Sequence, residues 1–244
     1  MPLNDKTILI VGGATGVGRA TAELAAGQGA HVVIASRSEE KLAQAAGEIG
    51  HGVTHSVVDM TNEAAVKAWA ADLPEVDYLV ISASSATHGP FATSETGPLR
   101  AMFDAKFFGP YVTAREVLPK MRPGGAIVLF SGVLSRKPGE NCAGLGAVNS
   151  AVEGLMRGMA LELGPDLRVN CISPGMVRTE AYDKVPADKR EAMYDSTGAS
   201  LPVGRVGLPE DIAAMVIATL TNGYMTGQVI DIDGGHMIRQ YATR

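Results

Sequence analysis

The first apolar run of the chain ends in Val11-Gly12-Gly13-Ala14-Thr15-Gly16-Val17-Gly18, and a pattern of helical spacing follows immediately. Glycines at a strand-to-helix turn allow a tight bend and let backbone N–H groups approach a phosphate at the N-terminus of the helix. A glycine cluster alone is a weak signal, because other tight turns use the same residue. Its place between a predicted strand and a predicted helix favours a dinucleotide-binding turn.

The rest of the chain alternates short apolar runs with helical patterns. After the run at 7–11, further strand-like runs lie at 32–35, 53–58, 78–81, 127–130, 169–172 and 229–232. Between them, apolar residues recur every three or four positions over 18–28, 39–49, 62–73, 99–121, 147–163 and 209–220. This alternation predicts an α/β fold with a parallel sheet and helices on both faces. The longest irregular stretch, about 176–207, is predicted to be a substrate loop or lid, with a floppy surface insertion as the alternative.

Composition and charge exclude several classes of protein. The chain has 244 residues, of which 46% are hydrophobic, and a formal net charge of −5, so it has no basic footprint for nucleic acid or an anionic membrane. A small-molecule partner is favoured by elimination. Two cysteines, Cys142 and Cys171, fit a reducing compartment, and neither a signal peptide nor an apolar run of about 18 residues is visible. We therefore expect a cytoplasmic protein without a membrane span and without a metal site.

The end of the second predicted strand indicates which dinucleotide is bound. It reads Ala35-Ser36-Arg37-Ser38. An acidic residue there would bond the ribose 2′-hydroxyl of NAD and repel a 2′-phosphate. Ser36 takes that place, and Arg37 offers a guanidinium that pairs with a phosphate. The sequence therefore predicts NADP(H), with Ser36 and Ser38 adding hydroxyl bonds. Arg19 either adds positive charge or is an ordinary exposed helix residue.

The spacing of Gly12, Gly16 and Gly18 resembles the glycine motif of the short-chain dehydrogenase/reductase family, with Val11 where that family has Thr. The resemblance continues through 168–170, 173–179, 204–213 and 226–235 and covers essentially the whole chain. It implies one Rossmann domain over 1–244, a doubly wound parallel sheet of about seven strands in the order 3-2-1-4-5-6-7. It also implies a homo-oligomer, a dimer or tetramer, assembled through two long helices and the C-terminal segment.

The resemblance also implies further cofactor contacts. Asp59 would bond the adenine amino group with Met60 packed beside it, although Asp59 as a helix cap is the alternative. Thr179 would contact the nicotinamide amide or the pyrophosphate. The full set of expected cofactor-binding residues is Gly12, Ala14, Thr15, Gly16, Val17, Gly18, Ser36, Arg37, Ser38, Asp59, Met60, Ser82, Ala83, Ser84, Asn149, Pro174, Gly175, Val177 and Thr179.

The resemblance breaks at the residues that carry the family's chemistry. In that family a Tyr is the general acid, a Lys lowers its pKa and bonds the nicotinamide ribose, a Ser positions the substrate oxygen, and an Asn holds a water. By local context the Ser position is Gly132, the Tyr position Leu145, the Lys position Asn149 and the Asn position Lys106. No tyrosine in the chain has a lysine four residues later, so no shift of register restores the motif.

Another group must therefore supply any proton. General acid catalysis contributes about a hundred- to ten-thousand-fold, and Leu145 has no proton to give. Lys106 is the first candidate, because burial lowers a lysine pKa toward the working pH. Its alternatives are a pair with Asp104 or a phosphate, or a side chain that extends to water. Ser131, one place before Gly132, and Asn149, which has the chemistry to bond the ribose, complete the expected catalytic set. Further candidates are Asn141, Cys142, Tyr182 and His88, of which His88 is otherwise a solvated loop residue.

Two functions follow from this pattern. The first is an NADP(H)-dependent oxidoreductase that reduces a small carbonyl, conjugated or imine substrate by hydride transfer without the usual Ser-Tyr-Lys. The second is a non-catalytic NADP(H)-binding protein, such as a redox sensor or an assembly subunit. A complete glycine turn for the cofactor, together with the loss of the residues that normally supply the proton, is compatible with both functions.

Overall fold

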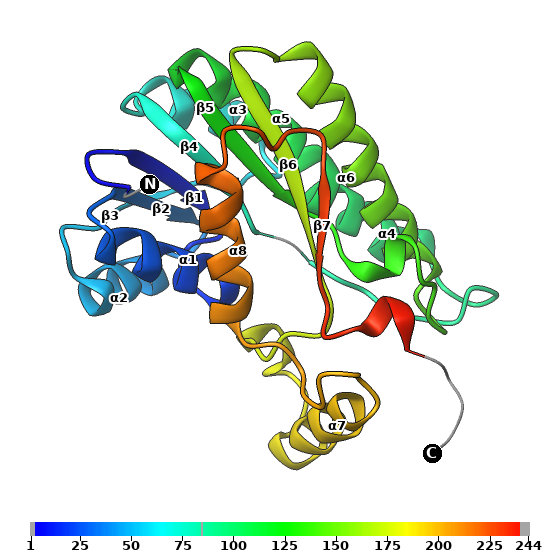
Figure 1. Cartoon of the computed structure of the whole chain (residues 1–244). Coiled ribbons are helices and arrows are strands. Elements are labelled where there is room, and N and C mark those ends of the chain that lie inside the picture. The colour runs from blue at the N-terminus through cyan, green and yellow to red at the C-terminus, as the bar shows by residue number, and fades with distance from the viewer. Residues whose placement is uncertain (1–2, 84, 240–244) are drawn as a thin grey trace.

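One parallel sheet organises the molecule, and the computed structural model describes residues 3–83 and 85–239 of it (Figure 1). Its strands are β1 (Thr7–Val11), β2 (His31–Ser36), β3 (Thr54–Val57), β4 (Val76–Ile81), β5 (Met121–Phe130), β6 (Leu167–Pro174) and β7 (Val229–Ile232). They lie in the order β3-β2-β1-β4-β5-β6-β7, and every neighbouring pair is parallel. The predicted fold class and strand order are confirmed.

Helices cover both faces of this sheet. They are α1 (Gly16–Gly27), α2 (Glu39–Ile49), α3 (Glu63–Ala71), α4 (Thr96–Phe103), α5 (Gly109–Val117), α6 (Ala143–Glu162), α7 (Ala187–Ala199) and α8 (Pro209–Thr221). Because side chains alternate along a strand, Ile8 and Ile10 enter one core with residues of α1, α2 and α8. Leu9 and Val11 enter the other, with residues of α3, α5 and α6. Two-sided burial explains why the strands read as continuous apolar runs.

The long helix predicted over 99–121 is interrupted. α4 is followed by a π-helical turn, Asp104–Phe108, then by α5 and a 3₁₀ turn, Leu118–Lys120. Met121 already belongs to β5, which is longer than the predicted strand at 127–130. Pro119 and Pro123 lack the N–H that a helix needs, so the helix cannot extend through them. The π-helical turn carries Lys106 and therefore bears directly on the site.

The predicted irregular stretch at 176–207 contains helices. Besides α7 it holds a 3₁₀ turn, Glu180–Tyr182, so the prediction of an irregular segment was wrong. Only Tyr194 and Gly198 of α7 are buried, so the helix has no apolar stripe to detect in the sequence. The two ends of the 176–207 stretch meet in a bridge between Val177 and Gly207, and α7 lies beyond the ends of the strands (Figure 1). Its role as a lid stays a prediction.

Candidate cofactor and active site

A cavity of about 840 Å³ lies along the carboxyl ends of the strands, where open α/β sheets bind their ligands. The expected cofactor residues that line it are Gly12, Thr15, Gly16, Val17, Gly18, Ser36, Arg37, Asp59, Met60, Ser82, Ala83, Pro174, Gly175, Val177 and Thr179. The fold thus brings together residues from five strand ends that are far apart in the sequence. Ala14 is buried in the core beside this lining, and Ser84 lies outside the described residues.

The glycine turn at residues 11–18 leaves no room for a side chain at Gly12 or at Gly18. Gly12 has a φ of +91°, and a Cβ there would lie 2.5 Å from the backbone nitrogen of Ala83. A Cβ on Gly18 would lie 2.2 Å from the carbonyl oxygen of Gly12. Thr15 makes no side-chain cap to α1, and the first turn of α1 has no acidic residue. The N–H groups at the start of α1 therefore face the cavity without a side-chain acceptor, which fits a phosphate.

Ser82 has a bracing role at this turn. Its hydroxyl lies 3.2 Å from the carbonyl oxygen of Val11 and 3.4 Å from that of Gly12. These bonds hold the glycine turn against the end of β4. A neighbouring strand thus supplies a hydroxyl to a turn in which the threonine of the family motif is replaced by Val11.

Two cations lie at the end of β2. Arg37 is exposed, lines the cavity, and forms neither a hydrogen bond nor an ion pair with a residue in 3–83 or 85–239. Lys41, one turn into α2, also lines the cavity, and the sequence analysis missed it. The sequence did hold a signal for Lys41, because it lies four residues after Arg37, about one helical turn away, and so can reach the same phosphate. Arg19 is instead ion-paired with Glu23 and Glu48 at 2.9 and 2.8 Å, so it is the ordinary helix residue.

Two neighbouring polar residues have structural partners. The hydroxyl of Ser38 accepts from the backbone N–H of Lys41 at 3.3 Å and caps α2, and Ser38 is not among the lining residues. Asp59 accepts from the backbone N–H and the hydroxyl of Thr61, which holds the pKa of Asp59 below its ordinary value. Asn62, rather than Asp59, caps α3. The carboxylate of Asp59 therefore remains ionised at the wall of the cavity.

Lys106 is the buried cation of the site. It is 7% exposed, lines the cavity, and donates from Nζ to the carbonyl oxygen of Ser131 at 3.1 Å. Burial lowers the pKa of Lys106 to about 8. No carboxylate of the described residues pairs with Lys106, so the ion pair with Asp104 is not formed. Because Lys106 is buried, its side chain does not extend to water either. Asp104 lies in the same π-helical turn, exposed, and also lines the cavity.

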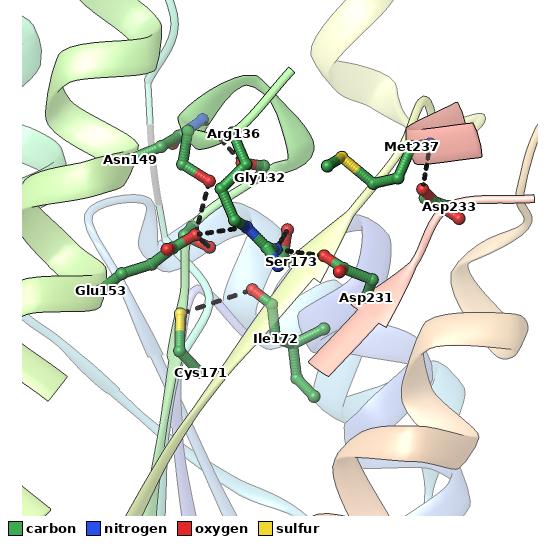
Figure 2. Close-up of polar contacts among 12 residues, drawn as sticks. Gly132, Arg136, Asn149, Glu153, Cys171, Ile172, Ser173, Asp231, Asp233 and Met237 are labelled. Carbon is green, nitrogen blue, oxygen red and sulfur yellow. Dashed lines mark hydrogen bonds and ion pairs between the residues drawn. The ribbon is translucent and has the colours of Figure 1, made fainter. Parts of the chain in front are cut away.

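Ser131 presents its backbone to Lys106 and its hydroxyl elsewhere. The Ser131 hydroxyl donates to Oε1 of Glu153 at 3.1 Å, and the hydroxyl of Ser135 donates to the same oxygen at 2.6 Å. Arg136 lies 3.8 Å from this carboxylate and bonds Asp231 on β7 (Figure 2). Glu153 is thus a buried acid that is satisfied by its surroundings, and the sequence analysis did not single it out.

The other three family positions are closed off from the cavity. Leu145 is 8% exposed and packs with Met102 and Val148 in a small apolar cluster. Asn149 is 2% exposed, and its Nδ2 donates to the carbonyl oxygen of Gly132 at 3.4 Å (Figure 2). Its Oδ1 is buried and has no protein partner within the described part of the chain. Gly132, Leu145 and Asn149 are all absent from the lining.

Of the remaining candidate residues, some line the cavity and others do not. Tyr182 lines the cavity, and burial raises the pKa of its hydroxyl. Nδ1 of His88 lies 3.3 Å from Sγ of Cys142, and neither residue lines the cavity. Burial raises the pKa of the Cys142 thiol. Of these residues, Tyr182 is therefore the one placed to meet a molecule in the cavity.

Within 3–83 and 85–239 no group of three or more His, Cys, Asp or Glu side chains is arranged to hold a metal ion. In that part of the chain no helix combines the length and the hydropathy needed to cross a bilayer.

Comparison with known proteins decides the family. A family model described as enoyl-(acyl carrier protein) reductase matches residues 12–237. An uncharacterized short-chain type dehydrogenase/reductase of Sinorhizobium fredii is 32% identical over 96% of the chain. The chain belongs to the short-chain dehydrogenase/reductase family. It spans 44% of the length of the Sinorhizobium relative, so that relative is much longer.

Other members of the short-chain dehydrogenase/reductase family match over their whole length. The 3-oxoacyl-[acyl-carrier-protein] reductase FabG of Thermotoga maritima is 30% identical, over 98% of this chain and 100% of its own. A solved structure described as a small-chain dehydrogenase in complex with NADPH is 34% identical with a TM-score of 0.81, over 95% of this chain and 98% of its own. The chain is thus an oxidoreductase of a family that binds nicotinamide cofactors.

Proposed function

We propose that this protein is an NADP(H)-dependent reductase in which Lys106 replaces the family's tyrosine as the group that meets the substrate oxygen. One observation carries the proposal: the buried ammonium of Lys106 lines the cavity at the position where the family has an asparagine. A buried charge costs free energy, so a protein keeps one where it serves a ligand or a reaction. The bound NADPH would supply the hydride.

The cofactor fit rests on the other end of the cavity. The glycine turn offers unobstructed N–H groups to the pyrophosphate, and Arg37 and Lys41 offer cations to a 2′-phosphate. Ser36 stands where an acidic residue would favour NAD. Asn149 is left out as a partner of the ribose, because it is 2% exposed and does not line the cavity.

Lys106 has the properties that proton donation requires. A general acid works best when its pKa lies near the operating pH, and burial has lowered the pKa of Lys106 to about 8. As hydride reaches a carbonyl carbon, the oxygen becomes negative and takes a proton from the ammonium. The carbonyl oxygen of Ser131 holds Lys106 in place during this step. Conjugated ketones and iminium ions need such an acid least, and they join simple carbonyls as candidate substrates.

A second function, non-catalytic NADP(H) binding, is favoured by a different observation. Leu145 sits in a closed apolar cluster with Met102 and Val148, and Asn149 lies behind Gly132. The place of the family's proton relay is thus filled with packed side chains rather than opened to substrate. A redox sensor or an assembly subunit would need the cofactor-binding turn but no proton donor at the position of Leu145.

A homo-oligomer and a cytoplasmic location complete the proposal. Phe108 and Tyr111, on the surface before and within α5, and Leu161, at the end of α6, are exposed large apolar side chains. Exposed apolar surface of this kind favours pairing with another copy. The free thiols of Cys142 and Cys171 fit a reducing compartment.

Fluorescence titration with NADPH and NADH, followed by NADPH oxidation against carbonyls, enones and imines, tests the proposal. We expect NADPH to bind at least about tenfold more tightly than NADH, as a charge-assisted contact to a phosphate predicts. Turnover of at least one substrate should fall about a hundredfold or more in Lys106→Met, with NADPH affinity unchanged. Tight NADPH binding without turnover of any compound would favour the non-catalytic function, and absence of NADPH binding would exclude both.

A further inference from the structure

The ammonium of Lys106 has unused bonding capacity. An ammonium has three N–H donors, and among the described residues Nζ donates to a single carbonyl oxygen, that of Ser131 at 3.1 Å. The only charge interaction that raises its pKa is with the Cys171 side chain, so no carboxylate of residues 3–83 or 85–239 compensates it. Buried cations in proteins are normally paired. Lys106 therefore presents an uncompensated positive charge to the cavity.

The surroundings of Lys106 strengthen its attraction for an anion. The cavity lining next to Lys106 in the chain includes Ala101 and Ala105, together with Phe130 beside Ser131 and the carboxylate of Asp104. Charges attract more strongly where little water separates them. Asp104 shares the π-helical turn but is exposed and forms no ion pair with Lys106.

The cations of the cavity form two separate groups. Arg37 and Lys41 follow β2, on one side of β1 in the sheet, whereas Lys106 bonds the end of β5, on the other side. Two strands, β1 and β4, lie between the two groups. Because Arg37 and Lys41 serve the cofactor phosphate in the proposed function, Lys106 is left for a different anion.

We propose that this anion is the carboxylate of the substrate, and that the substrate is a small 2-oxo acid held by Lys106 through both its carboxylate and its neighbouring carbonyl oxygen. The two donors of Lys106 that the protein leaves unused match these two adjacent oxygens. This inference rests on the proposed reductase function and names its substrate class.

Reduction of a 2-oxo acid needs only a hydride from NADPH and a proton from Lys106. Hydride from NADPH forms a C–H bond at the carbonyl carbon, and the electron pair of the C=O π bond moves onto oxygen. Lys106 transfers a proton to that oxygen and is recharged by water, so the products are a 2-hydroxy acid and NADP⁺. A carboxylate partner raises the pKa of Lys106, but the alkoxide is far more basic, so the transfer remains favourable.

Substrate pairs that differ in one charge test the inference. Benzoylformate is a 2-oxo acid, and its methyl ester has the same carbonyl without the negative charge. Because the ester is intrinsically more electrophilic, the diagnostic quantity is the acid-to-ester ratio of kcat/KM in each variant. We expect Lys106→Met to lower this ratio roughly 30-fold relative to the unmodified protein, the effect of losing one partner of a desolvated charge pair. Lys106→Arg should keep most of it.

The control variant is Lys41→Met, which removes a cation from the other end of the cavity. It should leave the acid-to-ester ratio unchanged. A ratio that is equal in the unmodified protein and in Lys106→Met, or one that falls equally in Lys41→Met, overturns the inference while the reductase function stands.

Binding of an unreactive pair gives a readout independent of turnover. In calorimetric titrations of the NADP⁺-saturated protein, benzoate should bind at least about tenfold more tightly than benzamide, and Lys106→Met should abolish the difference. If Lys106→Met does not fold, the unmodified protein and Lys106→Arg decide the question. Equal affinity for benzoate and benzamide in the unmodified protein overturns the inference, whereas failure to bind NADPH at all is a failure of the proposed function.

Discussion

The two ends of the cavity differ in what the chain has kept. At the β1–β2 end, the first N–H groups of α1 have no side-chain acceptor, and Arg37 lines the cavity without a hydrogen bond or ion pair to a described residue. At the end where α6 begins, Leu145 packs into an apolar cluster and Asn149 is buried behind Gly132, so neither faces the cavity. A single polar residue, Lys106, reaches the cavity from the family's four catalytic positions.

The difference separates two requirements that the family normally combines. Cofactor binding depends on backbone geometry, which tolerates few substitutions where two backbone segments are in contact. Proton supply depends on one group with a suitable pKa near the substrate, and that group can come from another element. The chain has preserved the first requirement and, in our proposal, met the second from the π-helical turn. Changes at each end should therefore have effects of a different kind.

The largest effect is expected at the glycine turn. Gly18→Ala places a Cβ 2.2 Å from the carbonyl oxygen of Gly12, so the backbone of the turn must move. We expect a loss of about 3 kcal/mol in the free energy of unfolding, the upper range for overpacking, and loss of NADPH binding. Chemical denaturation and fluorescence titration measure both.

The matched control is Gly47→Ala in α2, where nothing lies within 4 Å of the added Cβ. It should stabilise the protein by about 0.5–1 kcal/mol, because alanine is the better helix former. Equal behaviour of the two variants would contradict the account of the turn.

Lys106 should cost stability rather than supply it. A lysine pKa lowered on folding means that the native state binds fewer protons than the unfolded state between pH 8 and 10.5. The contribution of Lys106 is therefore unfavourable below pH 8, and this cost disappears as pH rises from about 8 toward 10.5. The Ser131 carbonyl oxygen loses its donor in Lys106→Met, which offsets part of the gain.

We therefore expect the free energy of unfolding of Lys106→Met to be about 1–3 kcal/mol higher than that of the unmodified protein at pH 7. This difference should shrink toward pH 10. Urea titrations of both proteins at several pH values measure it. A Lys106→Met protein that is less stable at pH 7 would show that the ammonium has a structural role and would weaken the contrast between the two ends.

A smaller effect is expected at the 2′-phosphate end. Arg37→Ala removes an exposed guanidinium that forms no hydrogen bond or ion pair with a described residue, although, besides the hydrogen bonds from Thr61, its charge lowers the pKa of Asp59. NADPH affinity should fall about 10- to 100-fold, and NADH affinity should change little, as for loss of one charge-assisted bond. Equal losses for the two cofactors would show that Arg37 does not contact a 2′-phosphate.

Much of this architecture was predictable from sequence, for identifiable reasons. The strands around Ile8 and Leu79 are apolar on both faces, and only a buried parallel sheet produces such runs between helical patterns. The bounds of α2 matched the prediction, because Ser38 caps its first turn. By contrast, α7 was missed because it buries few residues, and the π-helical turn at Lys106 was missed because helical periodicity does not distinguish it from α-helix.

The site was predictable where it depends on backbone and not where it depends on side-chain direction. Glycine spacing and Arg37 led to residues that line one end of the cavity, while Lys41 was overlooked although it lies one turn beyond Arg37. The direction of the Ser131 hydroxyl toward Glu153 depends on a contact between residues 22 positions apart. Tertiary packing sets such contacts, and local sequence does not encode them.

The pH dependence of single-turnover hydride transfer tests the central claim most directly. With saturating NADPH and an uncharged reducible substrate, the rate should be constant below pH 8 and fall as Lys106 loses its proton above about 8. The titratable group that interacts with Lys106 is Cys171 on β6, whose pKa burial raises to about 11, while Asp104 on the same turn as Lys106 is exposed. In Lys106→Met the rate should be at least about a hundredfold lower and independent of pH through that range. A profile that still falls near pH 8 in Lys106→Met, at an unreduced rate, would contradict the assignment of the proton to Lys106.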